Sequence, residues 1–400
     1  MVGGTADLRL AMWTYPWDVL DLGLEAVSRD LRERAGLNGI NIAAAYHAGR
    51  FFQPRSLRRK TFLPEDGTVY FQPDPKLWAG RRITPKVAGI VAEADVPRAL
   101  TAARERSGLS VACWTVCLHN MRLGLLHPDA STRNAFGEPS LFNLCPSHPD
   151  VRAYATTLVR DLSTGTRPDI VQLETPGFMP YAHGYHHEKD GVGLTAEDDF
   201  LLSLCFCESC TAAAGKAGID VEAARKTVRG WIAEASERAI PAPRWPDFAA
   251  QGPAVFAAHP EVEAYVRRRF EPVTSLLADM RDAAHPDVRI DVIDDGWRAG
   301  CDLAAVQRVS DGVVFCAYDR TPAAIETEAT ALRAVLDPRV KLGVGMRLFH
   351  PEMQSAADVV DRAQSAIRAG AMELDYYNYG LIPAARLDWV RAATAALTLL

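Results

Sequence analysis

Short apolar runs alternate along the chain with longer segments of helical spacing. The runs are rich in Val, Ile and aromatic residues, and between them apolar residues recur at steps of three and four. This alternation is typical of βα units, which build a parallel sheet. Eight runs have this character, and we predict strands over 8–13, 39–46, 109–120, 168–174, 288–295, 311–319, 339–346 and 371–380.

The longest predicted helix covers 262–284, where apolar residues such as Val266 and Val273 share one face. Pro272 interrupts this pattern, so we expect the helix to be kinked or split near that residue. Pro286 ends it, because proline restricts the residue before it. The other helices predicted between strands cover 149–162, 322–336, 356–369 and 384–397.

Eight strands, each followed by a helix, predict an α/β protein with a single (β/α)8 barrel domain over 1–400. A doubly wound sheet is the alternative. However, no G-x-G-x-x-G follows the first strand, and G-x-x-x-x-G-K-[ST] occurs nowhere. The 400 residues exceed the roughly 250 of a plain barrel, so long loops are expected. We predict the largest insertions over about 51–90, after the second strand, and about 175–260, after the fourth.

The composition, 48% hydrophobic and 24% charged, is that of a soluble globular protein and excludes disorder as the main state. The net charge of −6 and the absence of long Lys/Arg runs argue against nucleic acid as a partner. No stretch reaches the roughly 18 apolar residues of a membrane span, and the N-terminus lacks the pattern of an export signal. We therefore expect a cytoplasmic protein without a membrane partner, and a homo-oligomer is left open.

Aromatic and polar residues gather where the predicted strands end. In a (β/α)8 barrel the active site forms at the carboxyl ends of the strands. Aromatic faces beside polar groups suit a sugar, whose C–H faces stack on rings while its hydroxyls bind the polar groups. Any one of these residues is equally well explained as a cap on the barrel core, so the prediction depends on their coincidence. The predicted substrate-binding residues are Trp13, Tyr46, His47, Trp114, His119, Asn120, Trp297, Tyr318, Arg347, Tyr377 and Asn378.

Glu174 directly follows an apolar strand and precedes Thr-Pro-Gly. A carboxyl group in that position is partly withdrawn from water, which raises its pKa and suits a general acid. Hydrolysis of a glycosidic bond takes two carboxyl groups. The second is predicted to be Asp319 or Asp295, each at another strand end. Asp319 is equally explained as a helix N-cap, and Asp295 as part of a turn.

A cysteine motif, C-x-C-x-x-C, lies in the second insertion and comprises Cys205, Cys207 and Cys210. In a reducing compartment, clustered cysteines indicate a metal site rather than disulfides. Four thiolates make a closed tetrahedral zinc site, whose fourth ligand here is Cys145, Cys117 or a histidine such as His148. Because a closed site has no open position, the predicted zinc is structural. Buried free thiols are the alternative.

The stretch from Cys145 to Cys210, about a sixth of the chain, resembles the zinc-bearing β-galactosidases of glycoside hydrolase family 42. It equally resembles uncharacterised glycosidase-like barrel proteins. The shared features are a Cys-Pro-Ser-x-Pro stretch that opens a helix, a Glu that ends the fourth strand, and the C-x-C-x-x-C motif. This sequence has Leu173 where those enzymes have Asn, and no Glu ends its seventh strand. The resemblance implies that Glu174 is the acid/base and that zinc is bound by Cys145, Cys205, Cys207 and Cys210.

The loop after the fourth strand also carries three histidines, His183, His186 and His187. They indicate a second metal site, a flap that contacts substrate, or a polar exposed loop. The function predicted from all these features is a glycoside hydrolase-like enzyme that acts on a small-molecule carbohydrate or glycoside by carboxylate acid/base catalysis. The alternatives are a barrel lyase, isomerase or other hydrolase that uses His119 or a metal, and a non-catalytic carbohydrate-binding barrel.

Overall fold

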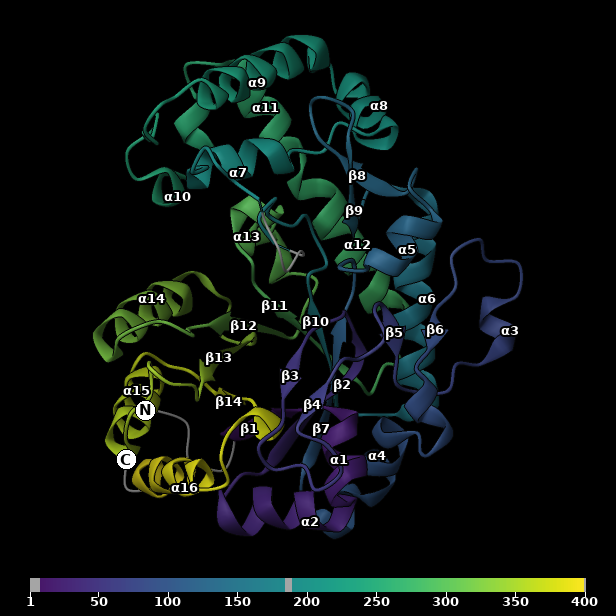
Figure 1. The fold of residues 1–400 in the computed structure, drawn as a ribbon, viewed down its shortest axis with the longest axis vertical. Helices are drawn as coiled ribbons and strands as arrows, with labels where there is room; N and C mark the ends of the chain where they lie inside the picture. The colour runs from purple at the N-terminus through teal and green to yellow at the C-terminus, as the bar shows by residue number, and fades with distance from the viewer. Residues whose placement is uncertain (1–7, 184–188, 399–400) are drawn as a thin grey trace.

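Eight parallel strands close into a barrel in the computed structural model, which describes residues 8–183 and 189–398 (Figure 1). The first strand pairs with the last, with Arg9 opposite Glu373, and this pairing closes the barrel. The predicted (β/α)8 barrel is therefore confirmed. In chain order the barrel strands are β1 (Arg9–Thr14), β2 (Gly39–Tyr46), β7 (Ser110–Val116), β10 (Ile170–Glu174), β11 (Arg289–Ile293), β12 (Gly312–Cys316), β13 (Lys341–Arg347) and β14 (Glu373–Tyr377).

Helices surround the barrel and cover its strands (Figure 1). The predicted helix over 262–284 is split in two, α11 (Pro260–Arg268) and α12 (Phe270–Ala283). Pro272 lies in the first turn of α12, where its missing N–H is not needed, so it opens the second helix. The other helices that flank the barrel are α1 (Pro16–Leu22), α2 (Leu24–Arg29), α4 (Val96–Ser107), α6 (Pro149–Thr166), α13 (Leu303–Val306), α14 (Pro322–Val335), α15 (Ala356–Arg368) and α16 (Arg386–Leu397). In the described part of the chain no helix is long and apolar enough to cross a membrane.

The insertion after β2 is fastened to the barrel and its helices by several contacts. Its strand β5 (Thr68–Val69) pairs antiparallel with the end of β2. The indole N–H of Trp78 donates to the carboxylate of Asp161 on α6 at 2.6 Å. The remaining elements of this insertion are β3 (Phe51–Phe52), β4 (Thr61–Phe62), α3 (Pro75–Trp78) and β6 (Lys86–Val87).

The insertion after β10 builds a helical layer at one end of the molecule, next to the hairpin of β8 (Ser131–Arg133) and β9 (Pro139–Leu144) (Figure 1). This layer has a hydrophobic cluster of its own, in which Phe200, Trp231 and Phe256 are buried. Its helices are α7 (Ala196–Ser203), α8 (Glu208–Lys216), α9 (Val221–Ser236), α10 (Phe248–Gln251) and α11.

Charged side chains occupy the barrel near the start of its strands. Arg9 on β1 forms an ion pair with Glu373 on β14, and Arg289 on β11 pairs with both Glu373 and Asp291. These ion pairs occupy the amino end of the barrel, whereas active sites of (β/α)8 barrels form at the carboxyl end.

Candidate active site

Five of the predicted aromatic residues meet at the carboxyl end of the barrel. The ring centroid of Trp13 lies 6.2 Å from that of Trp114, 5.9 Å from Tyr377 and 6.5 Å from Tyr318. Tyr46 joins the group at 4.9 Å from Trp114. The five side chains come from five different strands or strand ends, so barrel closure brings them together. Their contact with a sugar stays a prediction.

A hydrogen-bonded chain inside the barrel fixes the orientation of Trp13. Its indole N–H donates to the side-chain oxygen of Gln172 at 2.7 Å, and the Gln172 amide donates to Asp375 at 3.0 Å. Asn41 donates to the other oxygen of Asp375 at 2.8 Å. Because all four side chains are buried and paired, the floor of the site is rigid.

Tyr15 also lies with this group, although it was not among the predicted substrate-binding residues. Its hydroxyl lies 2.6 Å from that of Tyr377 and donates to that of Tyr46 at 3.0 Å. Burial raises the pKa of Tyr377 to about 12 and that of Tyr15 well above its usual range, so both hydroxyls keep their protons near neutral pH. The sequence signal was its position two residues after Trp13, at the end of the first strand.

Glu174 ends β10, and its carboxyl group is partly buried beside this aromatic group. Removal from water raises its pKa to about 7, although the hydrogen bond from the indole N–H of Trp114 works in the opposite direction. The pKa shift has the direction predicted from the sequence. A carboxyl group with a pKa near 7 keeps a proton at neutral pH part of the time, as a general acid requires.

Asp295 follows the next strand, β11, and its side chain is exposed at the rim, with protein groups close around its carboxyl group. Loss of surrounding water raises its pKa to about 7, and the negative charges of Glu174 and Asp294 add to this effect. The charge of Glu174 thus acts on Asp295 from the adjacent strand end and favours the neutral form of Asp295.

Asp319, the other predicted partner of Glu174, has a different environment. Its side chain is 63% exposed and forms an ion pair with Arg347. Arg347 also pairs with Glu352 at 2.6 Å. The carboxylate of Asp319 thus pairs with an arginine at the rim, whereas the charge of Glu174 acts on the carboxyl group of Asp295.

The histidines line another part of the rim. The His119 ring stacks on His47, with centroids 4.2 Å apart, and meets the His183 ring edge-on at 5.1 Å. Burial, together with His47 and His183, lowers the pKa of His119 to about 2, so this imidazole is uncharged at neutral pH. It has no proton to give as a general acid. The predicted metal site at His183 and His186 extends beyond the described residues, because His186 lies outside them.

Three further predicted residues have structural partners. Asn120 caps α5 (Met121–Leu126), accepting the backbone N–H of Leu123 at 2.8 Å. Asn378 accepts the N–H of Gly380 at 3.1 Å at the end of β14. Trp297 packs between Phe200 and Phe248, in the core of the helical layer. These contacts hold the loops around the site.

A cavity of about 230 Å³ adjoins Asp295. Its walls come from the loop after β10, the helix α7 and the turn after β11. Apolar side chains such as Phe178 and Met179 form one part, and His183, Asp199 and Arg298 supply polar groups. A ligand in this cavity has direct access to the Asp295 carboxyl group.

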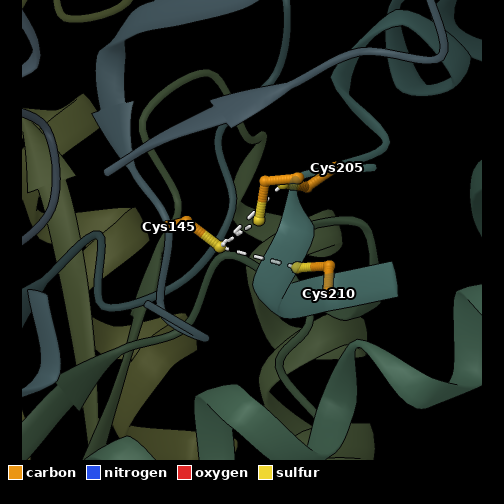
Figure 2. Close-up of side chains that lie close together, drawn as sticks. Cys145, Cys205 and Cys210 are labelled. Atoms are coloured by element: carbon orange, nitrogen blue, oxygen red, sulfur yellow. Dashed lines mark hydrogen bonds between the residues drawn. The ribbon is translucent and has the colours of Figure 1, made fainter. Parts of the chain in front are cut away.

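The four cysteines of the predicted zinc site lie together, and Figure 2 shows the side chains of Cys145, Cys205 and Cys210 pointing toward one another. Their sulfur atoms all fall within 4.8 Å of one another. The Cys145 sulfur lies 3.5 Å from Cys210, 3.5 Å from Cys207 and 3.9 Å from Cys205. Four sulfurs at about 2.3 Å from a tetrahedral Zn²⁺ are about 3.8 Å apart, so the cluster has the size that zinc requires.

The alternative fourth ligands lie elsewhere. The Cys117 thiol donates to the carbonyl of Thr115, within the turn after β7. His148 caps α6 and lies 3.9 Å from Asp129. Of the candidates for the fourth ligand, Cys145 is therefore the one that lies beside the C-x-C-x-x-C motif.

No protein-family model matches the chain, and no curated protein sequence matches it. Among solved structures, it is similar to alpha-L-fucosidase isoenzyme 2 from Paenibacillus thiaminolyticus (TM-score 0.55, 13% identity, covering 98% of this chain and 49% of that one). It is also similar to a beta-galactosidase from the psychrophilic Marinomonas ef1 (0.55, 14%, covering 98% and 59%). A third is the PgaB (BpsB) glycoside hydrolase domain from Bordetella bronchiseptica (0.54, 15%, covering 98% and 97%).

The chain thus spans 49% and 59% of the first two proteins and nearly all of the third. At these identities the likeness shows the fold, a (β/α)8 barrel that several glycoside hydrolases share. Since it extends to a fucosidase, a galactosidase and PgaB alike, it does not single out family 42.

Proposed function

We propose that this protein is a glycoside hydrolase with Glu174 as general acid/base and Asp295 as second carboxylate. The observation that carries the proposal is the placement of these two carboxyl groups at adjacent strand ends, with the charge of Glu174 acting on Asp295. Two carboxyl groups at adjacent strand ends both have pKa values raised to about 7, beside a floor of aromatic rings. Glycosidic cleavage needs one carboxyl group that donates a proton and a second that acts as a carboxylate.

The reaction follows from the protonation of this pair. Protonated Glu174 gives its proton to the leaving glycosidic oxygen as the bond from that oxygen to the anomeric carbon breaks. Ionised Asp295 either attacks the anomeric carbon or takes a proton from the water that does so. Water is consumed, and one new hydroxyl group appears on each product.

The aromatic floor and the tyrosine hydroxyls supply binding. Tyr318 and Tyr377, the partly exposed rings of the group, offer faces for the C–H groups of a sugar and lie over the buried rings of Trp13 and Trp114, and the Tyr377 hydroxyl offers a protonated donor. Their rigid placement supports orientation of the substrate before reaction. A carbohydrate or glycoside is therefore the proposed substrate.

A panel of aryl glycosides tests the proposal. Wild type should hydrolyse at least one member, and Glu174→Gln and Asp295→Asn should each lose most of that activity. Asp319→Asn is the matched control, since it removes a carboxylate of the same type that pairs with Arg347 at the rim. Full activity of Asp295→Asn with loss in Asp319→Asn would reverse the assignment of the second carboxylate. Sugar binding without any turnover by wild type would favour a non-catalytic carbohydrate-binding barrel.

We propose further that Cys145, Cys205, Cys207 and Cys210 hold one structural zinc ion. The sulfur spacing supports this, as does the backbone N–H of Arg133, which donates to the Cys205 sulfur at 3.4 Å. A four-thiolate zinc has no open position, so it supplies folding stability rather than chemistry. Elemental analysis of protein purified without added metal should find about one zinc per chain. Less than a tenth of an equivalent would refute the site.

A further inference from the structure

Arg269 is a buried cation without a hydrogen-bond partner. It lies at the junction of α11 and α12, and it is only 4% exposed. In the described part of the chain none of its three guanidinium nitrogens has a hydrogen-bond partner. The guanidinium instead lies over the rings of Phe178 and Phe200, 4.4 and 5.1 Å from their centroids. Burial lowers its pKa to about 10, which still leaves it charged at neutral pH.

A full charge in such a place is strongly unfavourable unless an opposite charge lies nearby. The two ring faces give some compensation, because their quadrupoles attract a cation. They do not replace the five hydrogen-bond acceptors that an arginine head normally meets. An anionic partner for Arg269 is therefore expected.

The neighbouring arginines already have anionic partners. Arg152 and Arg268 line the same cavity of about 380 Å³ as Arg269. Arg152 donates to Asp279 at 2.5 Å, and Arg268 donates to Glu271 at 2.6 Å. Each has a carboxylate of its own.

The four-cysteine cluster is the group that offers negative charge to Arg269. Cys205 and Cys210 line this same cavity. Attraction to Cys205, Cys210 and Cys145 favours the charged form of Arg269 against the effect of burial. Four thiolates around one Zn²⁺ carry a net charge of −2, and this charge is buried as well.

We infer that Arg269 compensates the charge of the four-cysteine zinc centre and thereby tightens its hold on the metal. The inference rests on the zinc site proposed above. Arg269 also connects the proposed zinc centre to the candidate active site. Phe178 and Phe200, on which the guanidinium lies, are walls of the cavity beside Asp295.

Zinc release to a chromogenic chelator measures this role in the full-length protein. Arg269→Met removes the charge and keeps an unbranched side chain of similar length. It should weaken zinc binding by roughly 10–100-fold, the usual effect of losing an outer-shell partner. Arg269→Lys keeps the charge and should retain more of the affinity. Arg268→Met is the matched control, because it removes a paired cation from the same cavity and should leave zinc release close to wild type.

Thermal unfolding with and without zinc separates charge compensation from packing. In zinc-loaded protein Arg269→Met should lower the melting temperature. In zinc-free protein the same substitution should raise the melting temperature, because it removes a buried charge that has no partner there. If Arg269 only fills space, Arg269→Met should lower the melting temperature of both the zinc-loaded and the zinc-free protein. If Arg269→Met does not fold, Arg269→Gln is compared with Arg269→Lys under the same expectation.

Equal zinc retention by wild type and Arg269→Met would overturn the inference and leave the zinc site standing. Absence of zinc from wild type would instead overturn the metal site itself. The two failures are therefore distinguishable in one set of measurements.

Discussion

Trp114 donates its indole N–H to the carboxyl group of Glu174, across the pairing of the adjacent strands β7 and β10. This bond favours the ionised carboxylate, whereas burial favours the neutral acid. The outcome is a pKa of about 7, so burial has the larger effect. Because the two influences come from different groups, they can be separated by mutation.

Glu174→Gln keeps the shape of the side chain and removes its proton. If Glu174 is the general acid, hydrolysis should fall by on the order of 10²–10⁴-fold, the usual contribution of general acid–base catalysis. Substrates with very acidic leaving groups need less protonation and should lose less. Steady-state kinetics on a series of aryl glycosides checks both effects. A variant that folds normally and turns over a confirmed substrate at the wild-type rate would make Glu174 structural.

Trp114→Phe removes the hydrogen bond to Glu174 and keeps an aromatic ring. The pKa of Glu174 should rise further, by roughly one unit for the loss of one hydrogen bond to a charged group. The alkaline limb of the pH–rate profile should then move to higher pH, because the acid keeps its proton longer. Trp13→Phe is the control, since its indole N–H donates to Gln172, a neutral amide. An equal shift in both variants would attribute the effect to the aromatic floor as a whole.

Glu174→Gln should also change the titration of Asp295. The charge of Glu174 helps to raise the pKa of Asp295, so its removal should lower that pKa. The residual hydrolysis of dinitrophenyl glycosides, which need little acid assistance, reports this change. The acidic limb of the pH–rate profile for this residual hydrolysis should move to lower pH, because Asp295 then ionises at lower pH. An unmoved limb would show that another group acts as the second carboxylate.

Much of this arrangement could be predicted from local patterns in the sequence. Three of the four residues before Glu174 are apolar, and all four are buried in β10. Each of the other seven predicted strands likewise overlaps a barrel strand, although the predicted run over 109–120 is longer than β7 because apolar residues continue into the turn after it. The raised pKa of Glu174 followed from the same pattern, since a carboxyl group that closes a buried strand loses water.

What the sequence left open depends on side-chain direction and on distant contacts. Asp295 and Asp319 both follow barrel strands, yet only the folded chain shows that Arg347 pairs with Asp319. Trp297 also follows a strand, but the helical layer of the second insertion packs against it. No local pattern in the sequence predicted that Arg269 is buried, because its burial results from the meeting of α11, α12 and the cysteine loop.

The raised pKa of Glu174 predicts how stability depends on pH. In the unfolded chain a glutamate titrates near 4.3, whereas in the folded protein this one titrates at about 7. Between these values the folded state holds a proton that the unfolded state has lost. The contribution to stability is therefore fully present below about pH 4.3 and is lost as the pH rises through 7. Gln at this position does not titrate, so the melting temperature of Glu174→Gln relative to wild type should increase from about pH 5 to about pH 8. A difference that stays constant over this range would mean that Glu174 titrates alike in both states.

Removal of zinc should affect stability more than turnover. The proposed four-thiolate site would hold the loop between α7 and α8 against the hairpin β8–β9, and unfolding would release the metal. A chelator should lower the melting temperature of wild type, while the initial rate measured below the unfolding temperature should change little. Cys207→Ser should show the lowered melting temperature without a chelator. Cys117→Ser is the matched control, because Cys117 is a buried thiol outside the cluster and its variant should still respond to the chelator. A chelator that abolishes turnover in folded protein would instead assign the metal to the chemistry.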